Sequence, residues 1–408
     1  MNKRVIGLAK RMAPWRRRGA ILGVCIAAAC SAAVQPANAQ SSRAPIRVGA
    51  VSALSGPVAF PEASRAAAAY FDSVNAAGGI NGRRIEYLSL DEMPDAAAAA
   101  RSADRLVSDP SVVALVGGSG VFDCAVNGKR YVDAGVMSLQ GASVAPECFF
   151  SSPNIVPMNN GPYMGLASAV IFARERLHSQ RLCVAVLDLP NMTTGYERAL
   201  GQLAKKTGRP SPDMHKVPPG GDATEVLRKF KEQHCDTAIY TGHEPAVLQW
   251  MASAREQGLT GVNWVFLAPA YTAALADALK SASDPVYAMS EFEPWQSRSM
   301  PLNDWRRLMR DAGLPASSLS QGGYVAAQFF VGVLRGMHEP ITRESVTRAL
   351  RNIAAQPHPM LGSPLAIGKR QAHAPNRTAL AMKLEDGTWR IASPFWIKVP
   401  DLSDEDGS

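Results

Sequence analysis

The stretch from Asn75 to Asp91, NAAGGINGRRIEYLSLD, restricts the fold more than any other part of the chain. The residues before it, PEASRAAAAYFDSVN, predict a helix, because alanine favours helices and Phe71 and Val74 fall on one apolar stripe. Gly78 and Gly79 are expected to end this helix, since glycine adopts a positive φ at no steric cost. An Asn-Gly turn and an alternating polar–apolar strand follow. The stretch therefore predicts one helix–turn–strand unit of an α/β fold.

The same alternation of strand and helix continues along the chain. Apolar runs such as SVVALVGGSG, RLCVAVLDLPN and NWVFLAPAY are each preceded or followed by helical patterns. Repeated alternation predicts parallel sheets with helices on both faces. A chain of about 370 residues after the leader exceeds the usual limit of a single core. The fold class is therefore α/β, with two doubly wound parallel-sheet lobes joined by a hinge, and the connector NIVPMNNGPYMG (154–165) marks the break between them.

The first 39 residues have the pattern of a secretory signal peptide. They contain seven cationic residues and no acidic one, then the apolar run GAILGVCIAAACSAAV and the small-x-small sequence Ala37-Asn38-Ala39. The apolar run is shorter than the roughly 20 residues that a membrane-spanning helix needs. We expect export to the periplasm, and Ala29-Cys30 leaves a lipid anchor open as an alternative.

The charge of the chain resides mostly in this leader. Subtracting its seven positive charges from the +8 of the whole chain leaves +1 for the remainder. No Lys/Arg-rich face remains that would indicate nucleic-acid binding. The acidic end, residues 400–408, is interpreted as a solvated tail.

Four cysteines remain outside the leader. An exported protein tolerates disulfides, and four cysteines allow three pairings. Cys124 and Cys148 are near in sequence and both close to predicted loops, so this pair is the favoured disulfide. Cys183 and Cys235 each open an apolar strand, and we expect buried free thiols there rather than a second bridge. No spacing of Cys or His residues predicts a metal site.

The order of these motifs resembles a known family. The segment IRVGAVSALSGPVA (46–59), followed by the helix, N-x-x-GGING-R and a strand ending in Asp, is similar to the first domain of type I periplasmic binding proteins. The resemblance is to the Leu/Ile/Val-binding receptors of ABC transporters. It implies three crossings between lobes. One lobe would comprise residues 45–157 and 285–357, and the other 158–284 and 358–399.

The resemblance also implies a ligand site. Ligands of open α/β sheets bind outside the carboxyl ends of the strands, where this chain has loops rich in Ser, Gly and Ala. Similar proteins hold the ligand with the loops that match the following residues: Ser119, Gly120, Gly141, Ala142, Ser143, His243, Glu244 and Tyr271.

Each of these side chains also has a purely local interpretation. Ser119 could satisfy a turn, Glu244 could cap a helix, and Tyr271 could pack locally. Many relatives carry an acidic residue where this chain has Ala-Pro-Ala-Tyr (268–271). Without that carboxylate, an aromatic or aliphatic acid is as credible a ligand as leucine or another amino acid.

Enzymatic motifs are incomplete. The segment GGSGV lacks the last glycine of G-x-S-x-G, and GSGVFD lacks the third glycine of the dinucleotide fingerprint. We therefore expect no enzyme and no cofactor. The resemblance implies a monomeric periplasmic protein that binds a small molecule and delivers it to an ABC-transporter permease. Hinge closure would retain the ligand. The alternatives are a ligand-sensing receptor subunit that signals to a membrane partner, and a secreted α/β enzyme with an unrecognised site.

Overall fold

The computed structural model describes residues 44–402, except residues 57–58, 94, 190 and 371. The predicted leader (1–39), with its possible lipid-anchor cysteine, and most of the acidic tail lie outside these residues. Within the described part, no helix combines the length and the apolar character needed to cross a membrane.

The first sheet contains five parallel strands in the order β2-β1-β3-β4-β5. The strands are β1 (Ile46–Ser52), β2 (Ile85–Asp91), β3 (Val112–Gly118), β4 (Ser138–Gln140) and β5 (Ile155–Pro157). Every residue of β3 is buried, as expected for a central strand covered on both faces.

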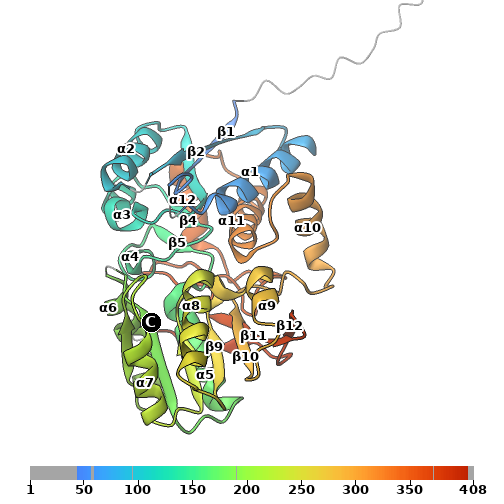
Figure 1. Cartoon of the computed structure of the whole chain (residues 1–408). Helices are drawn as coiled ribbons and strands as arrows, with labels where there is room; N and C mark the ends of the chain where they lie inside the picture. Colours follow the sequence, from blue (N-terminus) through green and yellow to red (C-terminus); the bar gives the residue numbers. More distant parts are fainter. Residues whose placement is uncertain (1–43, 57–58, 94, 190, 371, 403–408) are drawn as a thin grey trace, which may run out of the picture. The chain divides into compact units, whose positions relative to one another are not determined.

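Helices from two distant parts of the chain cover this sheet. Figure 1 shows α1 in blue beside α11 in orange. The early helices are α1 (Pro61–Ala76), α2 (Ala96–Val107), α3 (Asp123–Asp133) and α4 (Pro146–Phe150); the late ones are α10 (Pro301–Asp311), α11 (Ser318–Arg335) and α12 (Arg343–Asn352). Apolar residues of α1, β1, β3, α11 and α12 share one core cluster. Residues more than 200 positions apart therefore complete a single unit.

The predicted helix–turn–strand stretch is confirmed. Helix α1 ends at Ala76, and Gly78 and Gly79 have φ values of 100° and 75°. A side chain at Gly79 would overlap the carbonyl of Arg83, so the turn before β2 requires glycine there for space as well as for backbone conformation.

The second sheet follows the order β12-β11-β10-β9-β8-β6-β7, with β13 paired to β11. Its strands are β6 (Leu182–Leu187), β7 (Met214–Val217), β8 (Thr237–Tyr240), β9 (Asn263–Phe266), β10 (Val286–Ser290), β11 (Thr378–Glu385), β12 (Thr388–Ile391) and β13 (Ile397–Lys398). Strands β6 to β10 are parallel, and β11 and β12 form the predicted antiparallel hairpin, with Asp386 and Gly387 at positive φ in its turn.

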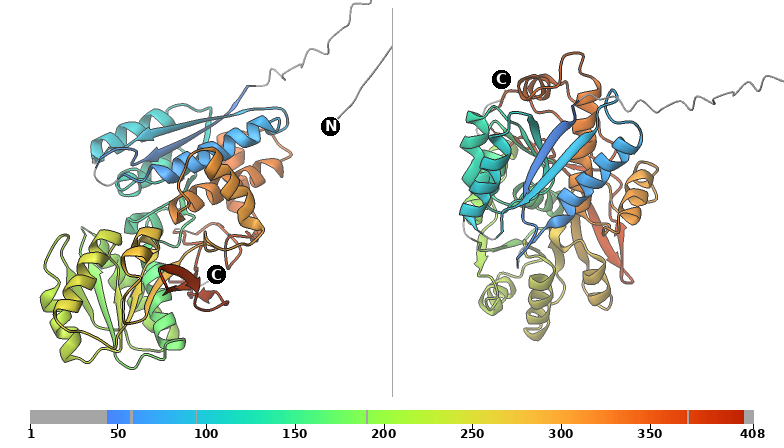
Figure 2. Two further views of the ribbon diagram at one scale, coloured as in Figure 1. Left: turned by 45° about the vertical axis from the view of Figure 1, so that its right-hand side comes forward. Right: turned by 90° about the horizontal axis from the view of Figure 1, so that it is seen from above.

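Helices also cover the second sheet, as Figure 2 shows in the green and yellow part of the ribbon. They are α5 (Gly161–Glu175), α6 (Met192–Thr207), α7 (Thr224–Glu232), α8 (Glu244–Glu256), α9 (Ala273–Ala278) and the 3-10 turn η1 (Ala268–Ala270). The predicted connector 154–165 contains β5 and the first turn of α5. Most residues of α5 are buried, so this helix lacks the polar face by which an amphipathic helix is detected in sequence.

Both cysteine pairs lie at disulfide distance. The predicted bridge between Cys124 and Cys148 is confirmed, with a Cα–Cα distance of 5.1 Å. The expectation of free thiols at Cys183 and Cys235 is wrong: these residues are paired, with Cα atoms 5.9 Å apart. Cys183 lies on β6, and Cys235 lies two residues before the neighbouring strand β8, which brings the two side chains together.

Candidate functional site

The predicted ligand loops follow strands β3, β4, β8 and β9. Because the strands are parallel within each sheet, the loops after β3 and β4 lie at one carboxyl edge, and those after β8 and β9 at another. The backbone amides of Gly141 and Ala142 both donate to the carbonyl of Gly118, which joins the first two loops directly.

The hydroxyl of Ser119 is hydrogen-bonded to another segment of the first unit. The side chain is 1% exposed, and its hydroxyl donates to the carbonyl of Phe60 at 2.6 Å. The neighbouring Gly120 has no room for a side chain, because a Cβ there would overlap Asp123 and the carboxylate of Glu92. This loop is held by contacts with the segments that contain Phe60 and Glu92, and its hydroxyl group already has an acceptor.

Glu92 is a buried carboxylate that the sequence did not single out. It follows β2, is fully buried, and accepts hydrogen bonds from the backbone amides of Val121, Phe122 and Asp123 at the start of α3. Burial raises the pKa of Glu92 to about 7, although the three amides act in the opposite direction. The free amide groups of the α3 N-terminus are therefore taken by the protein's own carboxylate.

Ser143 differs from Ser119. Its backbone forms two 3.0 Å hydrogen bonds with the side-chain amide of Asn159, one in each direction. Its hydroxyl oxygen is buried and has no hydrogen-bond partner. Ser143 is thus a fixed residue with an unused donor and acceptor.

The residues predicted on the second sheet have different surroundings. His243 is exposed at the N-cap of α8, while Glu244 accepts a hydrogen bond from the hydroxyl of Thr272. Tyr271 is 3% exposed, and its hydroxyl donates to Gln296 at 3.0 Å. Burial raises the pKa of Tyr271, so the phenol stays protonated. Its ring centroid lies 5.2 Å from that of Trp295.

The chain passes between the two sheets three times, and buried polar side chains join the three segments. Glu291, which follows β10, accepts hydrogen bonds from the amides of Asn160 and Gly161 at the start of α5, at 3.1 and 3.3 Å. Asn376, which precedes β11, donates to the carbonyls of Met158 and Glu291 at 3.3 and 2.9 Å. These bonds connect residues more than 80 positions apart.

Among the residues that the structure describes, the groups that affect the ionisation of Glu291 include no cation. It is 6% exposed, and burial raises its pKa to about 7, against the effect of the two backbone amides and of Asn159. Asn159 also holds the Ser143 loop, so one short segment connects a predicted ligand loop to the crossings.

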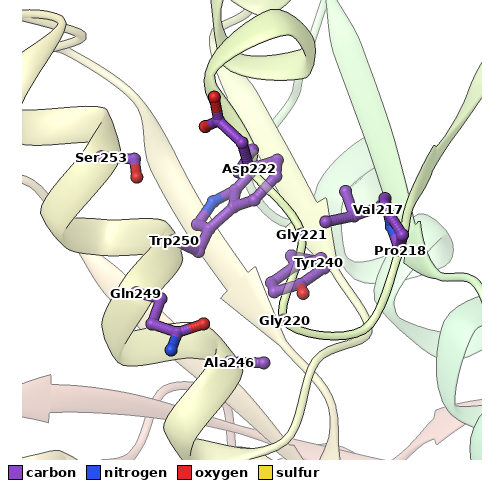
Figure 3. A pocket seen from close by; sticks show the side chains of 11 residues that line it. Val217, Pro218, Gly220, Gly221, Asp222, Tyr240, Ala246, Gln249, Trp250 and Ser253 are labelled. Atoms are coloured by element: carbon purple, nitrogen blue, oxygen red, sulfur yellow. The ribbon is translucent and has the colours of Figure 1, made fainter.

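Two cavities lie apart from the predicted residues. The first, of about 300 Å³, lies between the loop after β7 and helix α8 (Figure 3). The rings of Tyr240 and Trp250 stack there, with centroids 4.5 Å apart. The second, of about 490 Å³, lies beside α5, α6 and β13. Neither is lined by any of the eight predicted ligand residues.

The side chains around the predicted loops supply hydrogen-bonding groups. Within the described ranges, no three His, Cys, Asp or Glu side chains are grouped as ligands for a metal ion. The polar groups that sequence analysis missed are Glu92, Asn159 and Glu291. Each is defined by contacts with residues distant in sequence, so a local pattern gives no signal for them.

Comparison with known proteins agrees with this architecture. The family model described as periplasmic binding protein matches residues 45–388. The Leu/Ile/Val-binding protein of Escherichia coli (strain K12) is 27% identical over 222 residues, which are 52% of this chain. The chain spans 59% of the length of this curated relative.

Solved structures share the fold at low sequence identity. A fatty acid ABC transporter substrate-binding protein from Thermomonospora curvata superposes with a TM-score of 0.72 and 17% identity, covering 88% of this chain and 96% of that one. A solute-binding protein of an ABC transporter from R. palustris, in complex with 4-hydroxybenzoate, gives 0.69 and 16%, covering 88% and 98%. The match of the family model over most of the chain shows that the protein belongs to the periplasmic binding protein family.

Proposed function

We propose that this chain is the periplasmic substrate-binding component of an ABC transporter. It captures a small carboxylate-bearing ligand, either a branched-chain or other amino acid or an aromatic or aliphatic acid, and delivers it to a membrane permease. The supporting observation is the construction of the molecule: two α/β units, each with ligand-type loops at its carboxyl edge, connected by three segments with buried polar contacts. The ligand classes come from relatives that carry such names.

The mechanism follows from this construction. The ligand contacts loops of both units, so its binding favours the arrangement in which the two units are closed around it. We propose the lobes that the resemblance implies, residues 45–157 with 285–357 as one and residues 158–284 with 358–399 as the other, with one change. Strand β10 pairs with β9, so residues 285–290 belong with the second lobe.

The eight predicted residues remain the proposed ligand contacts. They differ in whether their polar groups are still available to a ligand. Ser143 has a free hydroxyl and His243 is exposed, which favours both. Ser119, Glu244 and Tyr271 are already hydrogen-bonded within the protein. Gly120, Gly141 and Ala142 would contribute backbone groups.

A thermal-shift screen of the exported chain tests the proposal. The panel contains amino acids, aromatic acids and aliphatic acids. A ligand present at 100 times its dissociation constant stabilises the folded state by about 2.7 kcal/mol, which moves the melting temperature clearly. We expect at least one of these compounds to do so. If no compound moves the melting temperature, the proposed function is contradicted.

A second measurement separates transport from sensing. The loaded protein should stimulate ATP hydrolysis by its permease and ATPase in proteoliposomes, and the ligand-free protein should stimulate less. Binding of ligand without any such stimulation would instead support the sensory alternative.

A further inference from the structure

The larger of the two cavities, of about 490 Å³, lies between helix α5, the end of α6 and the segment that contains β13. Its volume falls within the range of small-molecule sites, about 300–1,000 Å³. The helices α5 and α6 cover the second sheet, and β13 pairs with β11 of that sheet. None of the eight proposed ligand contacts lines the cavity, so it is separate from the strand-end loops.

The walls of this cavity are apolar and are held by neighbouring parts of the second unit. Phe172 and Ile397 line it and are 2% and 5% exposed. The Phe172 ring packs edge-on against Tyr287, with the ring centroids 5.2 Å apart. The indole of Trp396 packs directly over Gly362, because a Cβ at that glycine would overlap the ring. The apolar walls are therefore fixed by packing and are formed without a ligand.

Charged side chains surround these apolar walls. Arg176, Lys206 and Lys398 supply three positive charges, and Glu175 supplies one negative charge. All four residues are exposed. The long stems of arginine and lysine can lie along apolar surface while their charged ends stay in water. The cavity thus combines an apolar interior with a net positive rim.

Helix ends account for two of the three cations. Arg176 and Lys206 lie at the C-terminal ends of α5 and α6, where a positive charge complements the helix dipole. Lys398 lies on β13, outside any helix, and yet lines the same cavity. Cations from three separate elements therefore meet at one apolar cavity, which helix capping alone does not explain.

We propose that this cavity binds an amphipathic anion, a molecule with an apolar chain and one acidic head group. The chain lies against Phe172, Trp396 and Ile397, and the head group lies at Arg176 and Lys398. This second site goes beyond the proposed function. It recognises its ligand by two properties together: a short anion without a chain leaves the walls uncovered, and a neutral chain leaves the positive rim without a counter-charge.

Isothermal titration calorimetry with octane-1-sulfonate tests the inference. A sulfonate is chosen because the strand-end loops are proposed to hold a carboxylate. We expect this probe to bind at least about 10-fold more tightly than methanesulfonate, which lacks the chain, and than 1-octanol, which lacks the charge. Hexane-1-sulfonate should bind up to about 15-fold more weakly, since each fully buried methylene contributes about fourfold.

Charge variants locate the binding. Arg176→Glu and Lys398→Glu should each weaken the binding of octane-1-sulfonate about 3-fold or more, and Glu175→Gln should strengthen it. The control is Lys205→Glu, the same charge change at an exposed position of α6 that does not line the cavity. It should keep the affinity within about 2-fold. Because all four positions are exposed, we expect every variant to fold, and melting curves verify this.

Several results would overturn the inference. Equal affinity for octane-1-sulfonate and methanesulfonate would show that surface charge alone attracts the probe, as would an equal loss of affinity in Lys205→Glu and Arg176→Glu. Unchanged affinity in both Arg176→Glu and Lys398→Glu would place the probe elsewhere. Binding to vesicles of anionic phospholipid without binding of the free sulfonate would indicate a membrane surface instead. All of these outcomes leave the proposed function intact, because the thermal-shift panel tests it separately.

Discussion

Glu92 and Glu291 are two buried carboxylates that each bind the start of a helix, but they connect different parts of the chain. Each accepts hydrogen bonds from backbone amides at the start of a helix, and burial raises the pKa of each to about 7. Glu92 joins β2 to α3 inside the first unit. Glu291 joins the second crossing segment to the first, and its backbone carbonyl is bound by Asn376 of the third.

The difference teaches what a helix cap can do besides stabilising a helix. At α3 the capping group belongs to the same unit, so its loss should affect that unit alone. At α5 the capping group lies on another crossing segment, so its loss should also loosen the connection between the two units. The following predictions test this distinction.

The largest expected effect is on the pH dependence of stability. An ordinary glutamate has a pKa near 4.5, and a rise to about 7 corresponds to roughly 3 kcal/mol for each group. Between these values the folded chain keeps a proton that the unfolded chain has lost. Stability therefore falls as pH rises from about 4.5 to about 7, and this contribution is constant above that range.

Urea denaturation at several pH values measures this effect. Glu92→Gln and Glu291→Gln should each make the decline in unfolding free energy shallower, and the double variant should remove most of it. If the slope of either single variant equals that of the wild type, the raised pKa of that residue is contradicted.

Alanine at each position should cost about 2–3 kcal/mol of unfolding free energy at pH 7. Glu92→Ala leaves three backbone amides without an acceptor and Glu291→Ala leaves two, so we expect the larger loss for Glu92→Ala. Chemical denaturation of both variants provides the comparison. A larger loss of unfolding free energy in Glu291→Ala than in Glu92→Ala would show that the number of unpaired amides does not determine the loss.

Hydrogen exchange should separate the two regions. In Glu291→Ala the amides of Asn160 and Gly161 should exchange about 10-fold faster or more, while those of residues 121–123 keep their protection. Glu92→Ala should give the opposite pattern. Mass spectrometry of peptides covering the two helix starts measures both, and faster exchange at both sites in either variant would contradict local action.

The smallest effect is expected at the surface. Lys129 and Asp133 form an exposed i,i+4 ion pair on α3, at 2.6 Å. Such pairs contribute about 0.3–0.5 kcal/mol, so Lys129→Ala should change the unfolding free energy by no more than that. A loss above 1 kcal/mol in the same denaturation assay would mean that α3 is sensitive to any change, and the effect of Glu92→Ala would not be specific.

Sequence patterns predicted most of the strands and helices but few of the polar contacts. The helix ending at Gly78-Gly79 and the Asp-Gly hairpin follow from local backbone preferences, and both are confirmed. Helix α5 was missed because it is buried on nearly all sides. The pairing of Cys183 with Cys235 was missed because it depends on β6 and β8 being neighbours, which a single strand pattern does not reveal.

The sequence predicted less of the candidate site than of the fold. Loops at strand ends are located by topology, so the loops of Ser119 and Ser143 could be named in advance. Whether a hydroxyl in such a loop is free depends on its neighbours: that of Ser119 is hydrogen-bonded, and that of Ser143 has no partner. Asn159, the partner of the Ser143 backbone, belongs to another segment, which no periodic pattern connects to it.

The interleaving of the first unit has a consequence for how the protein is made. Strands β1 to β5 emerge from the ribosome early, but α11 and α12, which share their core, follow only after the chain has passed through most of the second sheet. Until about residue 352 has been synthesised, the apolar face of the first sheet that α1, α11 and α12 share is covered by α1 alone. Contacts between such distant segments slow folding and expose partly folded chains to aggregation. A nascent chain of this design gains from a chaperone that delays folding until its last third has arrived.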